Sequence, residues 1–200
     1  DIRLSQEAFA EQLIQNTNMD GADISTKASP YRSGHPVDSV KEKQMTEEER
    51  TPLIRKMRSL VGSLLWLSQA TRPDLSTITN MLAKYMSRPS PGHIDAAKWV
   101  IRYIKGTKDL GIKFSSQEDG QLSSYLKFKT NPKHIEALTD ANWGPQDQSN
   151  PKKYERIATF KSRSISGYVI WMGGPLHWES KRQKITARSS AEAEIYATDE

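Results

Sequence analysis

Between residues 51 and 105, apolar side chains recur every three or four positions, which is the spacing of amphipathic helices. The first of these helices is predicted over 51–69, with Pro52 in its first turn. Its apolar face carries Leu53, Met57, Leu60, Leu64 and Leu67. Such a stripe has to be buried, and the two helices that follow would complete a small bundle.

Proline and glycine delimit those two helices. The second is predicted over 75–87, with Asp74 as its cap. The third covers about 93–105, after the break at 89–92, and Gly106 is placed to end it. Their inward positions are Leu75, Ile78, Leu82 and Met86 in the second helix, and Ile94, Ala97, Ile101 and Ile104 in the third.

From residue 111 onward the pattern changes to strands. They are predicted at 111–114, 122–129, 135–139 and within 157–172. A turn at 173–174 leads into a return strand at 175–179, a basic loop at 181–188 and a helix that starts near Ser190. Helices first and strands later argue for two units, with a boundary near residue 118.

The first 50 residues are less regular. A helix is predicted over 1–18, with Phe9, Leu13 and Ile14 on one face. Residues 19–50 are rich in polar residues, glycine and proline, and we expect a loop or a linker there. The acidic run 47–49 lies where the next helix should begin, and acids are favourable near a helix N-terminus.

Positive charge is concentrated in the middle of the chain. Residues 1–50 hold 6 basic and 10 acidic side chains, residues 51–118 hold 11 and 4, and residues 119–200 hold 12 and 10. A basic region of this kind favours a polyanion, because cations near phosphates release counterions. The alternative, an ordinary solvated basic face, is about equally compatible with charge alone.

Several classes of site are excluded or disfavoured. The chain has no Cys, so disulfides and thiolate metal sites are ruled out, and its four His show no close metal-ligand spacing. No run of 18 apolar residues predicts a membrane span, and the N-terminus lacks the features of a secretory signal. An intracellular setting fits this composition.

Two carboxylates could converge on a divalent cation. Asp140 is expected to end a strand, and Glu192 lies in the first turn of the last predicted helix. Oxygen ligands of this kind suit Mg²⁺, and two such ions can assist phosphodiester hydrolysis. The competing interpretations are that Ser189 and Glu192 form a helix-capping box, and that Asp140 only begins a turn. Asp199 is interpreted as a solvated helix acid.

An ordered set of motifs resembles copia-type retrotransposon Pol polyproteins, over about residues 50–114 and 135–200. The segments that carry the resemblance are Val61–Leu67 (VGSLLWL), Thr71–Leu75 (TRPDL), Tyr103–Gly111 (YIKGTKDLG), Thr139–Trp143 (TDANW), Ser164–Val169 (SISGYV), Trp178–Gln183 (WESKRQ) and Ser189–Glu194 (SSAEAE). Each motif alone is modest, but their occurrence in family order is specific.

The resemblance implies the end of a reverse transcriptase joined to the first part of an RNase H that cleaves RNA in RNA–DNA hybrids with Mg²⁺. By motif position, Asp140 and Glu192 match two of the family's catalytic, metal-binding carboxylates. The family's third carboxylate would fall after Glu200 and its polymerase aspartates before Asp1. The implied partners are a hybrid or template–primer duplex and the rest of Pol, in a cytoplasmic virus-like particle or the nucleus.

The expected fold class is therefore α+β, with a thumb-like helical bundle followed by a partial RNase H-like sheet. Its expected divisions are 1–50, a reverse transcriptase segment and linker; 51–118, helical; and 119–200, RNase H-like. The alternative function is a non-catalytic nucleic-acid-binding remnant of a decayed element. The candidate phosphate contacts are Lys84, Arg88, Lys98, Arg102, Lys105, Lys108, Lys181 and Arg182.

Overall fold

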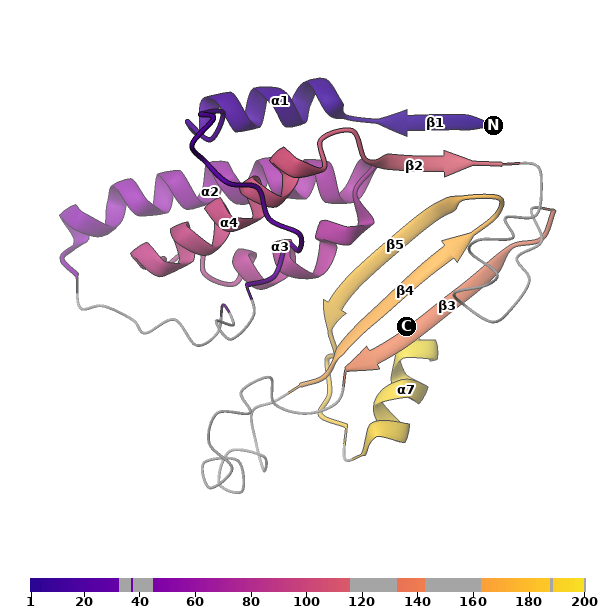
Figure 1. The fold of residues 1–200 in the computed structure, drawn as a ribbon. Coiled ribbons are helices and arrows are strands. Elements are labelled where there is room, and N and C mark those ends of the chain that lie inside the picture. Colours follow the sequence, from indigo (N-terminus) through magenta and orange to yellow (C-terminus); the bar gives the residue numbers. More distant parts are fainter. Residues whose placement is uncertain (33–36, 38–44, 116–132, 143–162, 188, 200) are drawn as a thin grey trace. The chain divides into compact units, whose positions relative to one another are not determined.

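The computed structural model describes residues 1–32, 37, 45–115, 133–142, 163–187 and 189–199. The chain divides into two compact units. One unit comprises Ser5–Gly111 and is helical, while the other comprises Asp1–Leu4 with Ile112–Glu200 and contains the sheets (Figure 1). The expected α+β class, a helical part followed by a mixed part, is confirmed. The chain passes between the units at residues 111–112, whereas residue 118 lies outside the described residues.

The helical unit consists of α1 (Glu7–Asn16), α2 (Glu47–Ala70), a 3-10 turn η2 (Pro73–Leu75), α3 (Ser76–Ala83) and α4 (Pro91–Gly106). Helices α2, α3 and α4 pack on one another, and α1 lies against α4 (Figure 1). The predicted apolar stripes form one core. Its largest fully buried side chains include Met57, Leu64, Leu67, Leu75, Leu82, Ile101 and Ile104.

Helix α2 begins earlier than the proline suggested. Thr46 accepts a hydrogen bond from the Glu49 N–H at 3.3 Å, and the Glu49 carboxylate accepts one from the Thr46 N–H at 3.0 Å. This capping box satisfies two N–H groups that would otherwise lack partners, so the helix starts at Glu47. The expectation that Pro52 lies in the first turn is therefore wrong, because Pro52 is inside the helix.

The second predicted helix is shorter than expected and is not capped by Asp74. Leu75 occupies the cap position without a side-chain hydrogen bond, and α3 ends at Ala83 rather than at residue 87. Asp74 is instead hydrogen-bonded to Arg72 and Tyr103, as described below. Arg72 is buried, and leaving its charge without a partner would be costly, which favours this role of Asp74 over capping.

Helix α4 begins at Pro91, two residues before the predicted start, with a capping box between Ser90 and His93. The helix ends at Gly106 as expected, but Gly106 is not in the left-handed conformation. A Cβ on Gly106 would lie 3.0 Å from the Cβ of Thr26. A side chain at residue 106 would therefore crowd Thr26, which belongs to the segment 19–32.

The second unit contains two sheets. β1 (Ile2–Ser5) pairs with β2 (Gly111–Phe114), so the predicted helix over 1–18 is wrong for its first residues and becomes α1 only from Glu7. The larger sheet has the order β3-β4-β5, with β3 (Glu136–Asn142), β4 (Ile165–Trp171) and β5 (Pro175–Arg182) antiparallel (Figure 1). The predicted strand at 122–129 lies outside the described residues.

The β4–β5 hairpin turns at Gly173, whose positive φ of 65° suits glycine. The next residue, Gly174, packs against β2, and a Cβ there would lie 2.5 Å from the Lys113 carbonyl oxygen. The Ser115 N–H donates to the Gly173 carbonyl at 2.7 Å. The hairpin tip and β2 therefore hold each other through backbone contacts. No helix in the described part of the chain is long and apolar enough to cross a membrane.

Candidate nucleic-acid interface and carboxylate site

The outward face of α2 combines arginines, small residues and an exposed tryptophan. Leu64 and its helical neighbours face the core, and the opposite face carries Arg55, Ser59, Gly62 and Trp66, which recur every three or four residues. Arg58 lies beside them and is also exposed. We call Arg55, Arg58, Ser59, Gly62 and Trp66 the α2 track.

Two members of the α2 track are costly for the helical unit itself. Trp66 is 58% exposed, although tryptophan is usually well covered in a folded chain. Gly62 lies inside a 24-residue helix, and a Cβ added there would meet nothing within 4 Å. Alanine at that position would favour the helix by about 0.5–1 kcal/mol, so internal packing does not explain the glycine. The close approach of a partner's surface to the helix would explain it.

The apolar stripe of α2 predicts its buried face, but the α2 track was not among the predicted contacts. The available signal was the position of Trp66, which falls two residues from Leu64 and so lies off the buried stripe. A large aromatic on the polar side of an amphipathic helix, one turn from a glycine, could have been singled out. The arginines at 55 and 58 share that side and add positive charge.

The TRPD segment forms a polar network at the end of α4. Arg72 is only 2% exposed and donates to Asp74 from Nε at 3.0 Å and from NH2 at 2.8 Å. Its remaining donors reach the carbonyl and hydroxyl oxygens of Thr107, both at 2.9 Å. The Tyr103 hydroxyl donates to Asp74 at 2.9 Å. The segment therefore joins the α2–α3 corner to the last turn of α4.

The same network shifts two pKa values. Burial alone would lower the pKa of Arg72, but the hydrogen bonds and charge of Asp74 outweigh it, and the pKa is raised. Burial and the hydrogen bond to Asp74 raise the pKa of Tyr103. Both shifts keep the ordinary protonation states at neutral pH, which fits a structural network.

Several of the predicted phosphate contacts are engaged within the helical unit. Lys105 donates to the carbonyl oxygens of Gly21 at 2.7 Å and Ile24 at 3.0 Å. Arg102 donates from Nε to the Ser25 carbonyl at 2.8 Å. These two cations hold the segment 19–32 against α4, a role that sequence analysis did not foresee.

The other predicted contacts of this unit differ in their surroundings. Lys108 forms an ion pair with Glu11 at 2.5 Å, and the hydrogen bond to Glu11, together with its charge, raises the pKa of Lys108. Lys84 and Arg88 are exposed. Lys98 is half-buried in a cleft beside α4. The phosphate-binding role of all these residues stays a prediction.

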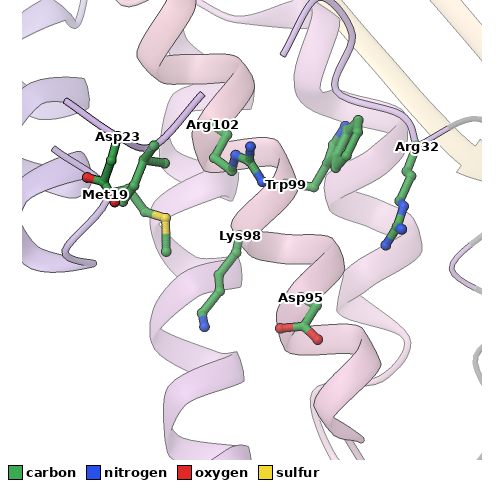
Figure 2. Close-up of a pocket in the computed structure, with 8 residues that line it drawn as sticks. Met19, Asp23, Arg32, Asp95, Lys98, Trp99 and Arg102 are labelled. Carbon is green, nitrogen blue, oxygen red and sulfur yellow. The ribbon is translucent and has the colours of Figure 1, made fainter. Parts of the chain in front are cut away.

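A cleft of about 490 Å³ lies between the segment 19–32 and α4. We call it the Trp99 cleft, after the tryptophan that lines it. Figure 2 shows Lys98, Trp99 and Arg102 on α4, with Asp23 and Arg32 on opposite sides in this view. The polar residues that line it are Asp23, Arg32, Asp95, Lys98, Trp99 and Arg102.

In the sheet-containing unit, the two predicted metal ligands lie on neighbouring elements. Asp140 is exposed within β3, opposite Gly167 of β4. The expectation that Asp140 ends its strand is wrong, because β3 pairs with β4 as far as Asn142. Glu192 is in the first turn of α7 (Ser190–Asp199), which packs against β3 and β4 (Figure 1).

Two hydrogen bonds hold Glu192, one through its backbone N–H and one through its carboxylate. Its N–H donates to the Ser189 hydroxyl at 3.1 Å, as the capping interpretation expects, and its carboxylate accepts from the Tyr196 hydroxyl at 3.1 Å. Gln183 is fully buried and donates to the Ser166 hydroxyl at 3.0 Å and to the Ala193 carbonyl at 2.8 Å. Gln183 thus fixes the start of α7 to β4.

No group of three or more His, Asp or Glu able to hold a metal ion occurs among the described residues. A pair of carboxylates would leave most positions around Mg²⁺ to water or substrate oxygens, which Mg²⁺ accepts. The roles of Asp140 and Glu192 stay predictions. Lys181 and Arg182 belong to β5 and not to a loop as expected, because pairing with β4 extends through Arg182. Lys181 lies 3.4 Å from the Glu179 carboxylate.

Comparison with known proteins places the chain in a family. It is 33% identical over 194 residues to the Retrovirus-related Pol polyprotein from transposon RE2 of Arabidopsis thaliana, covering 96% of this chain and 11% of that protein. It is 30% identical over 199 residues to the corresponding polyprotein from transposon TNT 1-94 of Nicotiana tabacum, covering 98% and 13%. No family model and no solved structure matches the chain.

A shorter relative is the Secreted RxLR effector protein 161 of Plasmopara viticola, 32% identical over 143 residues, which are 71% of this chain and 83% of that protein. The chain belongs to the copia-type retrotransposon Pol polyproteins. It spans between 11% and 13% of the length of the transposon polyproteins it matches, and corresponds to a segment of such a polyprotein.

Proposed function

We propose that the helical unit binds a nucleic-acid duplex, either template–primer or RNA–DNA hybrid, across the α2 track. The observation that carries the proposal is Gly62, a helix-interior glycine that the fold does not need, one turn from the exposed Trp66. A missing side chain lets a sugar–phosphate backbone approach the helix closely, and an exposed indole offers a flat surface to sugars and base edges.

Arg55 and Arg58 supply the charge for this contact. Arg58 lies one turn before Gly62 and Arg55 lies two turns before it, on the same exposed side of α2. Guanidinium groups form paired hydrogen bonds to phosphate oxygens, and such contacts position a duplex without reading its sequence. A polymerase-associated module requires binding of this kind, because it must hold every sequence that is copied.

For the sheet-containing unit we infer that Asp140 and Glu192 are two carboxylates of an RNase H site, which would hold Mg²⁺ in the intact polyprotein. The support is their motif positions, the packing of α7 on β3, and the hydrogen bonds that orient Glu192. When bound, Mg²⁺ would activate water and stabilise charge on the cleaved phosphate. This chain contributes by orienting the two carboxylates, and the rest of Pol would be the partner that completes the site.

The second candidate function is duplex binding without catalysis. It is favoured by the finding that no cluster of three metal-binding side chains occurs in the part of the chain that is described. In that case Asp140 and Glu192 are structural acids, and the α2 track carries the activity.

A salt titration of hybrid binding, run beside a Mg²⁺-dependent cleavage assay, separates these proposals. We expect affinity to fall steeply with salt, with a slope of about 0.9 per phosphate contact. Trp66→Ala should weaken binding with little loss of stability, because Trp66 is mostly exposed. Lys113→Ala, in the other unit, is the control.

The cleavage assay decides the role of the carboxylates. For these 200 residues alone we expect binding without turnover. Robust cleavage that Asp140→Asn abolishes would reject the non-catalytic alternative. Binding that is insensitive both to salt and to Trp66→Ala would reject the proposal for the α2 track.

A further inference from the structure

We propose that the Trp99 cleft binds an unpaired nucleotide of the nucleic acid held by the helical unit, with a preference for guanine. This inference rests on the proposed duplex binding. It adds a second contact, separate from the α2 track, on α4 and the segment 19–32. It assigns a ligand class to side chains that the α2 track leaves unused.

Positive charge is concentrated around Trp99. Three cations lie around one indole ring, with distances to the Trp99 ring centroid of 4.4 Å for Lys27, 5.5 Å for Arg32 and 5.9 Å for Arg102. Each cation gains from the ring, while the like charges repel one another. Arg32 and Arg102 also line the cleft; Lys98 is the third cation in its lining and makes no hydrogen bond or ion pair with the described residues. A phosphate would relieve this repulsion.

Two carboxylates, those of Asp23 and Asp95, also line the cleft. Neither forms an ion pair or hydrogen bond within the described part of the chain. A simple anion would be repelled by them, and a basic peptide would be repelled by the cations. The complementary ligand has an anionic group at one end and N–H donors at the other.

A nucleotide has this combination. Its phosphate would face Lys98, and its base would present N–H groups to Asp95 or Asp23 beside Trp99. Guanine offers two adjacent N–H donors to a carboxylate, whereas uracil offers one. The cleft volume of about 490 Å³ is in the range of small-ligand sites. The base must be unpaired, because in a duplex its donor edge is already bonded.

Fluorescence anisotropy on the full chain tests the proposal with three labelled hybrids of one duplex sequence. The first is blunt, the second has a three-nucleotide G overhang, and the third has a three-nucleotide U overhang. We expect the G overhang to tighten binding about tenfold over the blunt hybrid, since contact with one base is worth roughly that much. Lys98→Ala should remove this gain, so that the variant binds the G-overhang and blunt hybrids with equal affinity.

Asp95→Asn should reduce the difference between G and U, because an amide both donates and accepts. Lys113→Ala is the matched control and should leave all three affinities unchanged. Trp66→Ala should weaken all three hybrids together.

The outcomes separate the two proposals. If the blunt hybrid binds but overhangs add nothing, or if Lys98→Ala leaves the overhang gain intact, the cleft is not a nucleotide site and duplex binding stands. If the blunt hybrid does not bind, the proposed function fails. The overhang strands alone then still test the cleft: binding lost in Lys98→Ala supports it, and no binding of either strand rejects it.

Discussion

Replacing Gly62 by alanine should stabilise the helical unit and weaken nucleic-acid binding at the same time. The new methyl group enters open space, since nothing lies within 4 Å of a Cβ at this position. Alanine is favoured over glycine inside helices by about 0.5–1 kcal/mol. We therefore expect the free energy of unfolding to rise by that amount in urea or thermal denaturation.

The effect on binding should have the opposite sign. If a sugar–phosphate backbone packs against the bare helix at Gly62, the methyl group overfills that contact. Overfilling a packed contact costs about 1–3 kcal/mol, or roughly 5- to 150-fold in affinity. Hybrid binding at two salt concentrations measures this loss, and the salt dependence should stay the same because no charge is removed.

Gly106→Ala is the matched control, because its new Cβ would lie 3.0 Å from the Thr26 side chain, away from the α2 track. It should not raise stability. A Gly62→Ala chain that is more stable and binds the hybrid with unchanged affinity would show that no partner approaches α2 at this residue. The argument for the α2 track would then be lost.

Three further predictions concern the fold. Asp74→Ala should lower the free energy of unfolding by about 2–3 kcal/mol in urea denaturation, because it strands the buried Arg72 guanidinium; an unchanged unfolding midpoint would contradict this. Gly174→Ala should destabilise the sheet-containing unit by roughly 1–3 kcal/mol, because its Cβ would lie 2.5 Å from a backbone oxygen, and near-native amide exchange in β2 would refute it. The folded-state pKa of Tyr103 is raised, so the folded chain keeps that proton to higher pH than the unfolded chain does. Stability should therefore decline as pH rises above about 10. Tyr103→Phe should reduce that decline, measured by denaturation between pH 9 and 11.

Local pattern was sufficient for most elements of the helical unit. The spacing of apolar residues identified the buried stripes of α2 and α4, since a helix that buries one face repeats every three to four residues whatever it packs against. The errors fell at the ends of elements. The start of α2 was set by the reciprocal bonds of Thr46 and Glu49, and the role of Asp74 was set by Arg72 and Tyr103.

Charge in the sequence indicated a polyanion partner but did not indicate which cations are available to it. In the sequence, Lys105 and Arg102 were predicted to contact phosphates. In the structure, they donate to backbone carbonyls of the segment 19–32. Those carbonyls are about 80 residues away in the chain, so only folding brings them together. The pairing of β1 with β2, more than 100 residues apart, was invisible for the same reason.

By itself the sequence determined the family, the order of helices and strands, and the two carboxylates that the motifs select, because these depend on residue type and short-range spacing. The tertiary structure alone decided which cations are engaged, and that Asp23, Asp95, Lys98 and Trp99 share one cleft. Proximity of this kind depends on packing between distant segments, and no local pattern encodes it.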